Sequence, residues 1–287
     1  MGEASARVFM AKPSKAPDIL LKSVTTALHE ASRGNPLFLR RLVKSDATSA
    51  VLFLLGEHPR RRHPYEPCII LNKRSMRVRQ PGDLCFPGGR ISLPFDLCGA
   101  KILSMLPLMP LARWVHWPHW RSYRRREIKN LALLFATGLR ESFEEMRLNP
   151  FLTRFLGPMP SQNLDMFSRV LYPMVVWVHQ KHFLTNWEVE KIIAIPLSSL
   201  LDPGNYACCR IFFKADPGAP IAQRPKDFPC FRHLEEGEEV LWGVTYRIVT
   251  LFLDLVFRFN VPAIASLPVI HRILDERYLY GSVSARR

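Results

Sequence analysis

The segment from residue 131 to 148 constrains the fold of this chain more than any other. Its apolar side chains recur at helical spacing, and this periodicity predicts one amphipathic helix. The expected apolar stripe consists of Leu133, Leu134, Ala136, Leu139 and Phe143. An apolar stripe of this length has to be covered by another layer of the protein, so we expect the helix to pack on a sheet.

Three acidic residues lie on the opposite face of the same predicted helix. Glu141, Glu144 and Glu145 stand at i, i+3 and i+4, which places them side by side. Each close pair of like charges costs a few tenths of a kcal/mol, roughly, on a helix surface. A divalent cation reverses that cost, because Mg²⁺ binds carboxylate oxygens and substrate phosphates. The three glutamates are therefore candidate metal ligands, and a solvated acidic face is the alternative.

A glycine-containing loop precedes this helix in the chain. Residues 81–89 read Pro-Gly-Asp-Leu-Cys-Phe-Pro-Gly-Gly, ending in the adjacent pair Gly88 and Gly89. Two glycines in succession let the backbone approach a phosphate closely, although a Pro-Gly-Gly sequence also occurs in ordinary turns. A glycine loop together with an acidic helix indicates metal-assisted phosphate chemistry.

The two fragments, in this order, resemble the two halves of the Nudix hydrolase box, Gly-x5-Glu-x7-Arg-Glu-U-x-Glu-Glu-x-Gly-U, where U is aliphatic. Residues 71–75, Arg79 and residues 81–89 resemble the signature that precedes the box in the coenzyme A diphosphatases of that superfamily, although the gap from Arg79 to Gly82 is one residue short. Residues 172–176, 186–197 and 241–248 resemble later segments of the same subfamily. The resemblance covers about residues 40 to 260.

The chain departs from the Nudix pattern at three places. Phe95 stands where the first acid of the box is expected, with Asp96 one position later, and Arg147 replaces the final glycine. Gly89 and Arg140 are 51 positions apart instead of the expected 14, which leaves an insertion of about 37 residues. Closing a loop about four times longer costs only about 1.2 kcal/mol, so the insertion is tolerable for the fold.

The resemblance implies an α/β fold, a Nudix-type α/β/α sandwich with a mixed sheet and an inserted helical segment. We expect an N-terminal tail and helix at 1–34 and one domain at 35–287, with the insertion at 97–130. It also implies hydrolysis of the diphosphate of coenzyme A or acyl-coenzyme A, giving 3′,5′-ADP and (acyl-)phosphopantetheine. The alternatives are another nucleoside diphosphate derivative as substrate, or a catalytically impaired module that binds nucleic acid or anionic membrane.

The same resemblance implies roles in the active site for specific residues. Glu141, Glu144 and Glu145 would hold Mg²⁺ or Mn²⁺, and Arg140 would steady the helix by pairing with an acid, here Asp96 or another partner. Gly88 and Gly89 would wrap the site. The candidates for phosphate contacts are Lys73, Arg74 and Arg79, and a further acid or base could come from Glu188 or Glu190.

The insertion has an apolar half followed by aromatic residues interleaved with arginines at 113–126. Such a pattern suits contacts with bases or with an anionic membrane surface. The alternative is a helical hairpin whose tryptophans pack on the body while the arginines face water. His116 and His119 are separated by Pro118, so we do not expect them to form a metal pair. A second copy of the chain, in a homodimer, is another partner left open.

Composition limits the remaining classes of partner, cellular location and metal site. A hydrophobic content of 48% indicates a folded core, and the net charge of +15 favours anionic partners. No apolar run reaches the roughly eighteen residues of a membrane helix, so we expect a cytoplasmic protein. The six cysteines contain no C-x-x-C pair, and we expect buried, reduced thiols and no zinc.

The remaining periodicities predict the other elements. A helix is expected at 19–31, a strand hairpin at 49–55 and 68–71 around a basic loop, and strands at 170–179 and 192–195. A short strand at 210–214 lies within a segment rich in Pro, Gly and Asp, and a last, mostly apolar helix spans 245–257.

Overall fold

The computed structural model describes residues 16–33, 47–57, 66–164, 169–214, 225–235, 237–275 and 278. Residues 1–15 of the expected N-terminal tail lie outside the described residues, as do the proposed domain boundary near 34 and most of the basic loop between the first two strands, including Arg60–62. Within the described part of the chain, no helix combines the length and the apolar character needed to cross a bilayer.

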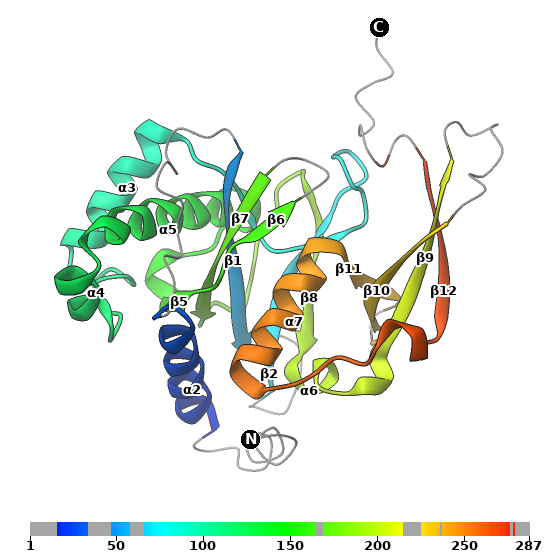
Figure 1. The fold of residues 1–287 in the computed structure, drawn as a ribbon. Helices are drawn as coiled ribbons and strands as arrows, with labels where there is room; N and C mark the ends of the chain where they lie inside the picture. Colours follow the sequence, from blue (N-terminus) through cyan, green and yellow to red (C-terminus); the bar gives the residue numbers. More distant parts are fainter. Residues whose placement is uncertain are drawn as a thin grey trace, which may run out of the picture.

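The centre of the molecule is a mixed sheet of eight strands (Figure 1). Its main path runs β3-β2-β1-β7-β5, with β8 paired to β2, β4 to β1 and β6 to β7. Strands β1 and β7 are parallel, and the other pairs are antiparallel. The strands are β1 Thr48–Glu57, β2 Pro67–Arg74, β3 Leu84–Cys85, β4 Gly88–Arg90, β5 Thr153–Pro158, β6 Gln162–Leu164, β7 Arg169–Val178 and β8 Val189–Pro196. The predicted strands at 49–55, 68–71, 170–179 and 192–195 are confirmed within this sheet.

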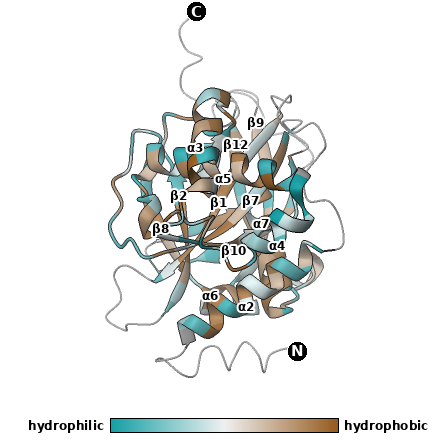
Figure 2. Cartoon of the chain, turned by 90° about the vertical axis from the view of Figure 1, so that its left-hand side faces the viewer, coloured by the Kyte–Doolittle hydropathy of each residue, from teal (hydrophilic) through white to brown (hydrophobic). Residues whose placement is uncertain are grey.

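Helices cover both faces of the sheet. Alternation along β1 sends Phe53 and Leu55 into one apolar cluster with helices α2 and α7, and Leu52 and Leu54 into another with α3, α4 and α5. Figure 2 shows the central strands in mostly apolar colours between these helices. The helices are α2 Ala16–Ala31, α3 Leu93–Met105, α4 Trp117–Tyr123, α5 Arg125–Met146, α6 Leu197–Leu200 and α7 Gly243–Phe257, with 3-10 turns at Pro150–Leu152, Pro203–Asn205 and Ile264–Ser266. The expected α/β/α sandwich with a mixed sheet is confirmed.

A second, four-stranded sheet stands beside the first and was not predicted (Figure 1). Its order is β11-β10-β9-β12, with β12 parallel to β9. The strands are β9 Tyr206–Lys214, β10 Lys226–His233, β11 Glu239–Trp242 and β12 Val269–Asp275. The sequence indicated only 210–214, because Pro229 inside β10 weakens the strand signal. In the structure, this strand is β9 and begins at Tyr206, four residues before the predicted strand at 210–214.

The long helix α5 begins six residues earlier than expected and ends at Met146. The prediction of Phe143 in its apolar stripe was wrong, because this side chain is 49% exposed. Ser142 and Met146 take the buried positions of that turn, following Leu139 at helical spacing, and the guanidinium of Arg147 lies 5.1 Å from the centre of the Phe143 ring.

The insertion forms α3, α4 and the first turn of α5, and its tryptophans are buried. Trp114, Trp117 and Trp120 join the apolar cluster below α5, and the Trp114 indole donates a hydrogen bond to the Leu156 carbonyl at 3.0 Å. The arginines at 113, 121 and 125 are exposed. The helical-hairpin interpretation is therefore confirmed, and the interpretation in which these tryptophans contact bases or lipid was wrong.

The insertion also contacts the N-terminal helix. The rings of His29, on α2, and His116 stack with centroids 3.7 Å apart, and His119 meets His29 edge-on at 5.3 Å. Burial, followed by the neighbouring histidine charges, lowers the pKa of His29 to about 4. The three rings thus pack α2 against the insertion.

The cysteines are reduced, as expected, but not all are buried. Cys68, Cys208, Cys209 and Cys230 are buried, Cys85 is partly buried and Cys98 is exposed on α3. The expectation of buried thiols was therefore wrong for Cys98.

Arg147 offers a test of the helix end. It adopts a left-handed conformation at φ 54° after the last turn of α5, where a side chain is strained and glycine is not. We expect Arg147→Gly to raise the free energy of unfolding by about 0.5–1 kcal/mol in urea denaturation. Arg258→Gly is the matched control, because Arg258 ends α7 at the same φ of 54°. A loss of stability in both variants would contradict the strain at these helix ends.

Candidate active site

The glycine loop lies between the central sheet and helix α5. Strand β4 pairs with β1 through Ala50 opposite Gly89 and Val51 opposite Gly88. A Cβ atom at Gly88 would lie 2.3 Å from the Ala50 carbonyl oxygen, and one at Gly89 would lie 2.4 Å from the Glu141 carboxyl carbon. Gly88 therefore excludes any side chain, because it faces the β1 backbone, whereas a side chain at Gly89 would displace the Glu141 carboxylate. The loop backbone rests directly against the acidic face of α5.

Glu145 is held from two sides at the end of this loop. The Asn72 side-chain amide donates to its Oε2 at 2.6 Å, and the Gly88 N–H donates to its Oε1 at 3.4 Å. The pKa of Glu145 is raised to about 8: burial is the largest cause and the charges of Glu141 and Glu188 add to it, while the two hydrogen bonds act in the opposite direction. Sequence reasoning missed Asn72, since nothing in its neighbourhood along the chain pairs it with position 145.

The three glutamates do not converge. Glu141 is partly buried against Gly89, and burial raises its pKa against the opposing charge of Arg140, whose Nη1 is 3.0 Å from Glu141 Oε1. Glu144 is 52% exposed, and its Oε1 lies 3.2 Å from the same Nη1. The structure thus brings Glu141 and Glu145 to the loop and leaves Glu144 on the outer side, beside Arg140.

Arg140 pairs with Asp96, the acid one position after the expected place in the Nudix box. Its Nε donates to Asp96 Oδ1 at 2.8 Å and its Nη2 to the Arg90 carbonyl at 2.9 Å, and Asp96 is only 1% exposed. The Ser92 N–H and the Thr137 hydroxyl also donate to Asp96, at 2.6 and 2.9 Å. Phe95, by contrast, is 72% exposed. Asp96, in the first turn of α3, is thus the buried acid that anchors Arg140.

The basic candidates differ in their surroundings. Lys73 is compensated by two carboxylates, at 3.0 Å from Glu239 and 3.6 Å from Glu190. The Arg74 Nε donates to the Arg79 carbonyl at 2.7 Å. The structure therefore brings Arg74 and Arg79 together on one loop and pairs Lys73 with carboxylates.

Glu188 and Glu190 have different neighbours in the structure. Glu188 stands close enough for its charge to raise the pKa of Glu145, and its carbonyl accepts from the Ser75 N–H at 2.8 Å. Glu190 lies beside Lys73 instead. Of the two, Glu188 is the one that belongs to the neighbourhood of the glycine loop.

Among the described residues, no three His, Cys, Asp or Glu side chains converge in an arrangement that could hold a metal ion. Two carboxylates, Glu141 and Glu145, do adjoin the glycine loop, and the charge of Glu141 raises the pKa of Glu145. A divalent cation between them would relieve that repulsion, and carboxylate oxygens suit Mg²⁺ or Mn²⁺. The donor set therefore fits the ion through these two residues.

Comparison with known proteins finds weak likeness to solved structures only. No family model matches the chain, and no curated protein is significantly similar to it. A Nudix hydrolase from M. smegmatis, RenU, is 11% identical over 53% of this chain and 72% of its own, with a TM-score of 0.34. The NUDIX domain of Shewanella oneidensis NrtR complexed with ADP ribose is 14% identical over 60% and 84%, with a TM-score of 0.33. A MutT/nudix family protein from Enterococcus faecalis is 9% identical over 88% and 74%, with a TM-score of 0.37. Likeness at this level assigns no family.

The buried ion pair can be tested by removing one partner. We expect Asp96→Ala to lower the free energy of unfolding by about 2–4 kcal/mol, because Arg140 is left without its buried counter-charge. Asp227→Ala is the matched control, since the Arg210–Asp227 pair has the same Nε–Oδ1 distance of 2.8 Å but is exposed. Its loss should stay below about 1 kcal/mol. Equal losses in urea denaturation would contradict a structural role for Asp96.

The raised pKa of Glu145 predicts a pH dependence of stability. The folded chain keeps this proton up to a pH of about 8, whereas the unfolded chain loses it near the ordinary value of 4.5. Between these values the folded state binds more protons, so the free energy of unfolding falls as the pH rises. We expect Glu145→Gln to reduce this fall, which thermal denaturation without metal from about pH 5 to about pH 9 would show. The exposed Glu144→Gln should follow the unchanged protein; identical curves for all three would contradict the burial of Glu145.

Proposed function

We propose that this chain is a Nudix-type diphosphatase that hydrolyses coenzyme A or acyl-coenzyme A to 3′,5′-ADP and (acyl-)phosphopantetheine. The observation that carries the proposal is the contact between the glycine loop and α5, where Gly89 lies against Glu141 and Gly88 donates to Glu145. The order of the sequence motifs supports the subfamily, and the side-chain-free loop supports a phosphate as the group that lies there.

Glu141 and Glu145 would hold the Mg²⁺ or Mn²⁺, with Glu144 as the third candidate ligand. The ion would supply positive charge that neutralises diphosphate oxygens and lowers the pKa of a water molecule. Asn72 fixes the orientation of the Glu145 carboxylate, and Arg140, anchored by Asp96, fixes the last turns of α5. Arg140 is thus a positioning residue.

The general base that accepts the proton of the attacking water has to be a carboxylate that does not bind the metal ion. Glu188 is our candidate, because its charge reaches Glu145 while Glu190 is paired with Lys73. Arg74 and Arg79 are the preferred candidates for contacts with the substrate phosphates. Lys73 is a weaker one, because Glu239 and Glu190 already compensate its charge.

Two alternatives remain as proposals. The same site could act on another nucleoside diphosphate derivative, such as a dinucleotide or nucleotide sugar. A catalytically impaired module would instead bind nucleic acid or anionic membrane through residues 113–126. With Trp114, Trp117 and Trp120 buried, such binding would depend mainly on the exposed arginines and would weaken with salt.

The direct test is an activity assay with coenzyme A and Mg²⁺ or Mn²⁺ at mildly alkaline pH, with 3′,5′-ADP detected by chromatography. We expect product from the unchanged protein and a rate at least about 100-fold lower for Glu145→Gln, because the loop loses a charged ligand. Glu30→Gln, an exposed change on α2, is the control and should keep full activity.

The other outcomes separate the alternatives. Cleavage of other diphosphates but not of coenzyme A would reject the subfamily and keep the hydrolase. No cleavage of any diphosphate, together with salt-sensitive binding that is lost when Arg121 and Arg125 are replaced, would favour the binding module.

A further inference from the structure

Helix α3 carries apolar side chains on the side that faces solvent. Its other side packs on α5 and holds the buried residues Asp96, Ala100 and Leu103. Helical spacing turns most of the remaining side chains outwards, and apart from one lysine they are uncharged. The outward, exposed residues are Pro94, Phe95, Leu97, Cys98, Lys101, Ile102 and Met105. A helix that is apolar on all sides is normally covered on all sides, so we expect a partner for the outer face of α3.

The apolar surface continues beyond the end of the helix. Leu106 and Leu108 follow α3 directly and are 49% and 75% exposed. Among the described residues, twenty large apolar side chains are exposed, and nine of them lie between residues 91 and 126. Single exposed apolar side chains are normal, but a concentration of this kind marks a site of interaction. We call the outward residues of α3, together with Leu106 and Leu108, the α3 surface.

The exposed charges of this segment are all positive. Between residues 91 and 126 the sequence holds a single acid, Asp96, which is buried in its pair with Arg140. The exposed cations of the segment are Lys101, Arg113, Arg121 and Arg125. Helices α3 and α4 lie on the same side of the molecule, on the left in Figure 1 and towards the viewer in Figure 2. The α3 surface therefore has an apolar centre and positively charged surroundings.

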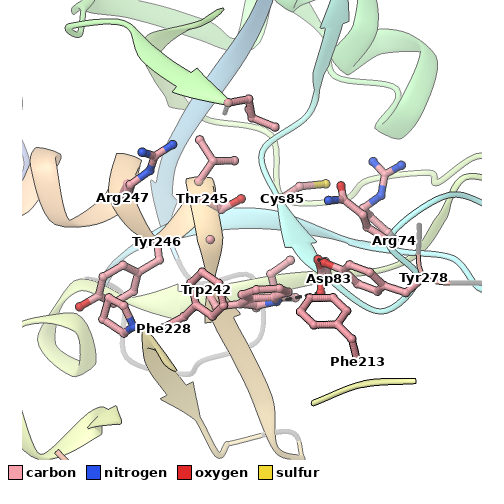
Figure 3. A pocket seen from close by; sticks show the side chains of 16 residues that line it. Arg74, Asp83, Cys85, Phe213, Phe228, Trp242, Thr245, Tyr246, Arg247 and Tyr278 are labelled. Atoms are coloured by element: carbon pink, nitrogen blue, oxygen red, sulfur yellow. Dashed lines mark hydrogen bonds between the residues drawn. The ribbon is translucent and has the colours of Figure 1, made fainter. Parts of the chain in front are cut away.

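Three other occupants fit the α3 surface less well. The cavity of about 370 Å³ between the two sheets is lined mainly by β3, the start of α7 and the second sheet, and by no residue of the insertion, so a small molecule bound there leaves the α3 surface uncovered (Figure 3). A second copy in a two-fold dimer would bring Lys101 and the nearby arginines close to the same cations of its partner, and like charges repel. Nucleic acid would suit the cations, but its phosphates and sugars cannot cover aliphatic side chains.

We propose that the α3 surface docks onto an anionic lipid bilayer. The apolar side chains of the surface would lie at the boundary between headgroups and acyl chains, and Lys101 and the exposed arginines would extend to the anionic headgroups. A bilayer adapts to a protruding helix and needs no matching groove. This contact differs from binding through residues 113–126, because apolar side chains at 94–108 carry it. It does not depend on the proposed reaction.

The test is cosedimentation of the full chain with vesicles of phosphatidylcholine and phosphatidylserine, compared with vesicles of phosphatidylcholine alone. We expect binding to the anionic vesicles, and binding at least about tenfold weaker to the neutral ones. Replacing both Met105 and Leu108 by Gln should weaken binding to the anionic vesicles at least about tenfold, because two apolar side chains no longer enter the bilayer. The matched control replaces Leu234 and Ile273 by Gln, which are 59% and 60% exposed beside the second sheet, and should change nothing.

A dye on Cys98 locates the contact. All six cysteines lie within the described residues, and Cys98 is the only exposed one. A polarity-sensitive maleimide dye attached there should shift its emission to shorter wavelength when anionic vesicles are added, because α3 enters a less polar environment. Binding to the vesicles without this shift would mean that another part of the chain, such as 113–126, makes the contact, and would overturn the proposal.

Two further results would also overturn it. One is the absence of binding to anionic vesicles; self-association that disappears in the Met105→Gln, Leu108→Gln variant would then assign the surface to a second copy. The other is equal binding by this variant and the unchanged protein. If the variant fails to fold by circular dichroism, Lys101→Glu decides: it should weaken binding to the anionic vesicles at least about fivefold, and unchanged binding rejects the proposal.

Docking and hydrolysis can fail separately. Met105 and Leu108 lie at the end of α3 that is distant in sequence from Asp96, so the variant that loses vesicle binding should still form 3′,5′-ADP from coenzyme A at the rate of the unchanged protein. Vesicle binding without cleavage of any diphosphate would keep the docking and reject the proposed reaction. Cleavage without vesicle binding would keep the reaction and reject the docking.

Discussion

The close contact between the glycine loop and helix α5 is the constraint on which the rest of the site depends. Gly88 and Gly89 pair with β1 on one side and touch Glu141 and Glu145 on the other, and the β1 backbone leaves no room for a Cβ atom at Gly88. Because the loop is tied to the sheet by backbone pairing, α5 has to lie at a fixed height above β1. The carboxylates therefore face the backbone of the loop at contact distance, which is the arrangement that phosphate chemistry with a metal ion requires.

The long insertion maintains this arrangement. It continues from the first turn of α3, which carries Asp96 to the guanidinium of Arg140, and it ends by running directly into α5. Its tryptophans then complete the apolar cluster on that face of the sheet. Since loop closure depends only weakly on length, a segment whose tryptophans pack in the core next to this buried acid is compatible with an intact site.

The charges around the loop show why a cation would be stabilised there. Glu145 carries a raised pKa because of burial and because Glu141 and Glu188 are near, and two neutral hydrogen-bond donors, the Gly88 N–H and the Asn72 amide, oppose this. Arg140, the nearest cation to Glu141, is shared with Asp96 and Glu144. On the side of the loop, the negative charges of Glu141 and Glu145 are therefore not fully balanced by nearby cations, although the chain as a whole is positively charged.

The sequence by itself determined the elements whose signals are local. The periodicity of 131–148 predicted α5, alternation predicted the β1–β2 hairpin and β7, and the glycine pair predicted a close backbone approach. Helical spacing also placed Glu141 and Glu145 on one face, although it could not tell that Glu144 turns outwards to Arg140. The prediction that Phe143 is buried was wrong for a related reason. Helical spacing alone does not show where a helix extends beyond the rest of the protein that packs on it.

Only the tertiary structure decided the partners that are distant along the chain. Asn72 reaches Glu145 across 73 positions and Asp96 reaches Arg140 across 44, distances over which no sequence periodicity carries information. The second sheet, with Pro229 in one strand, and the cavity it forms beside β3 depend in the same way on packing between separate segments. The raised pKa of Glu145 was also beyond the sequence, because it follows from burial, and burial exists only once the chain has folded.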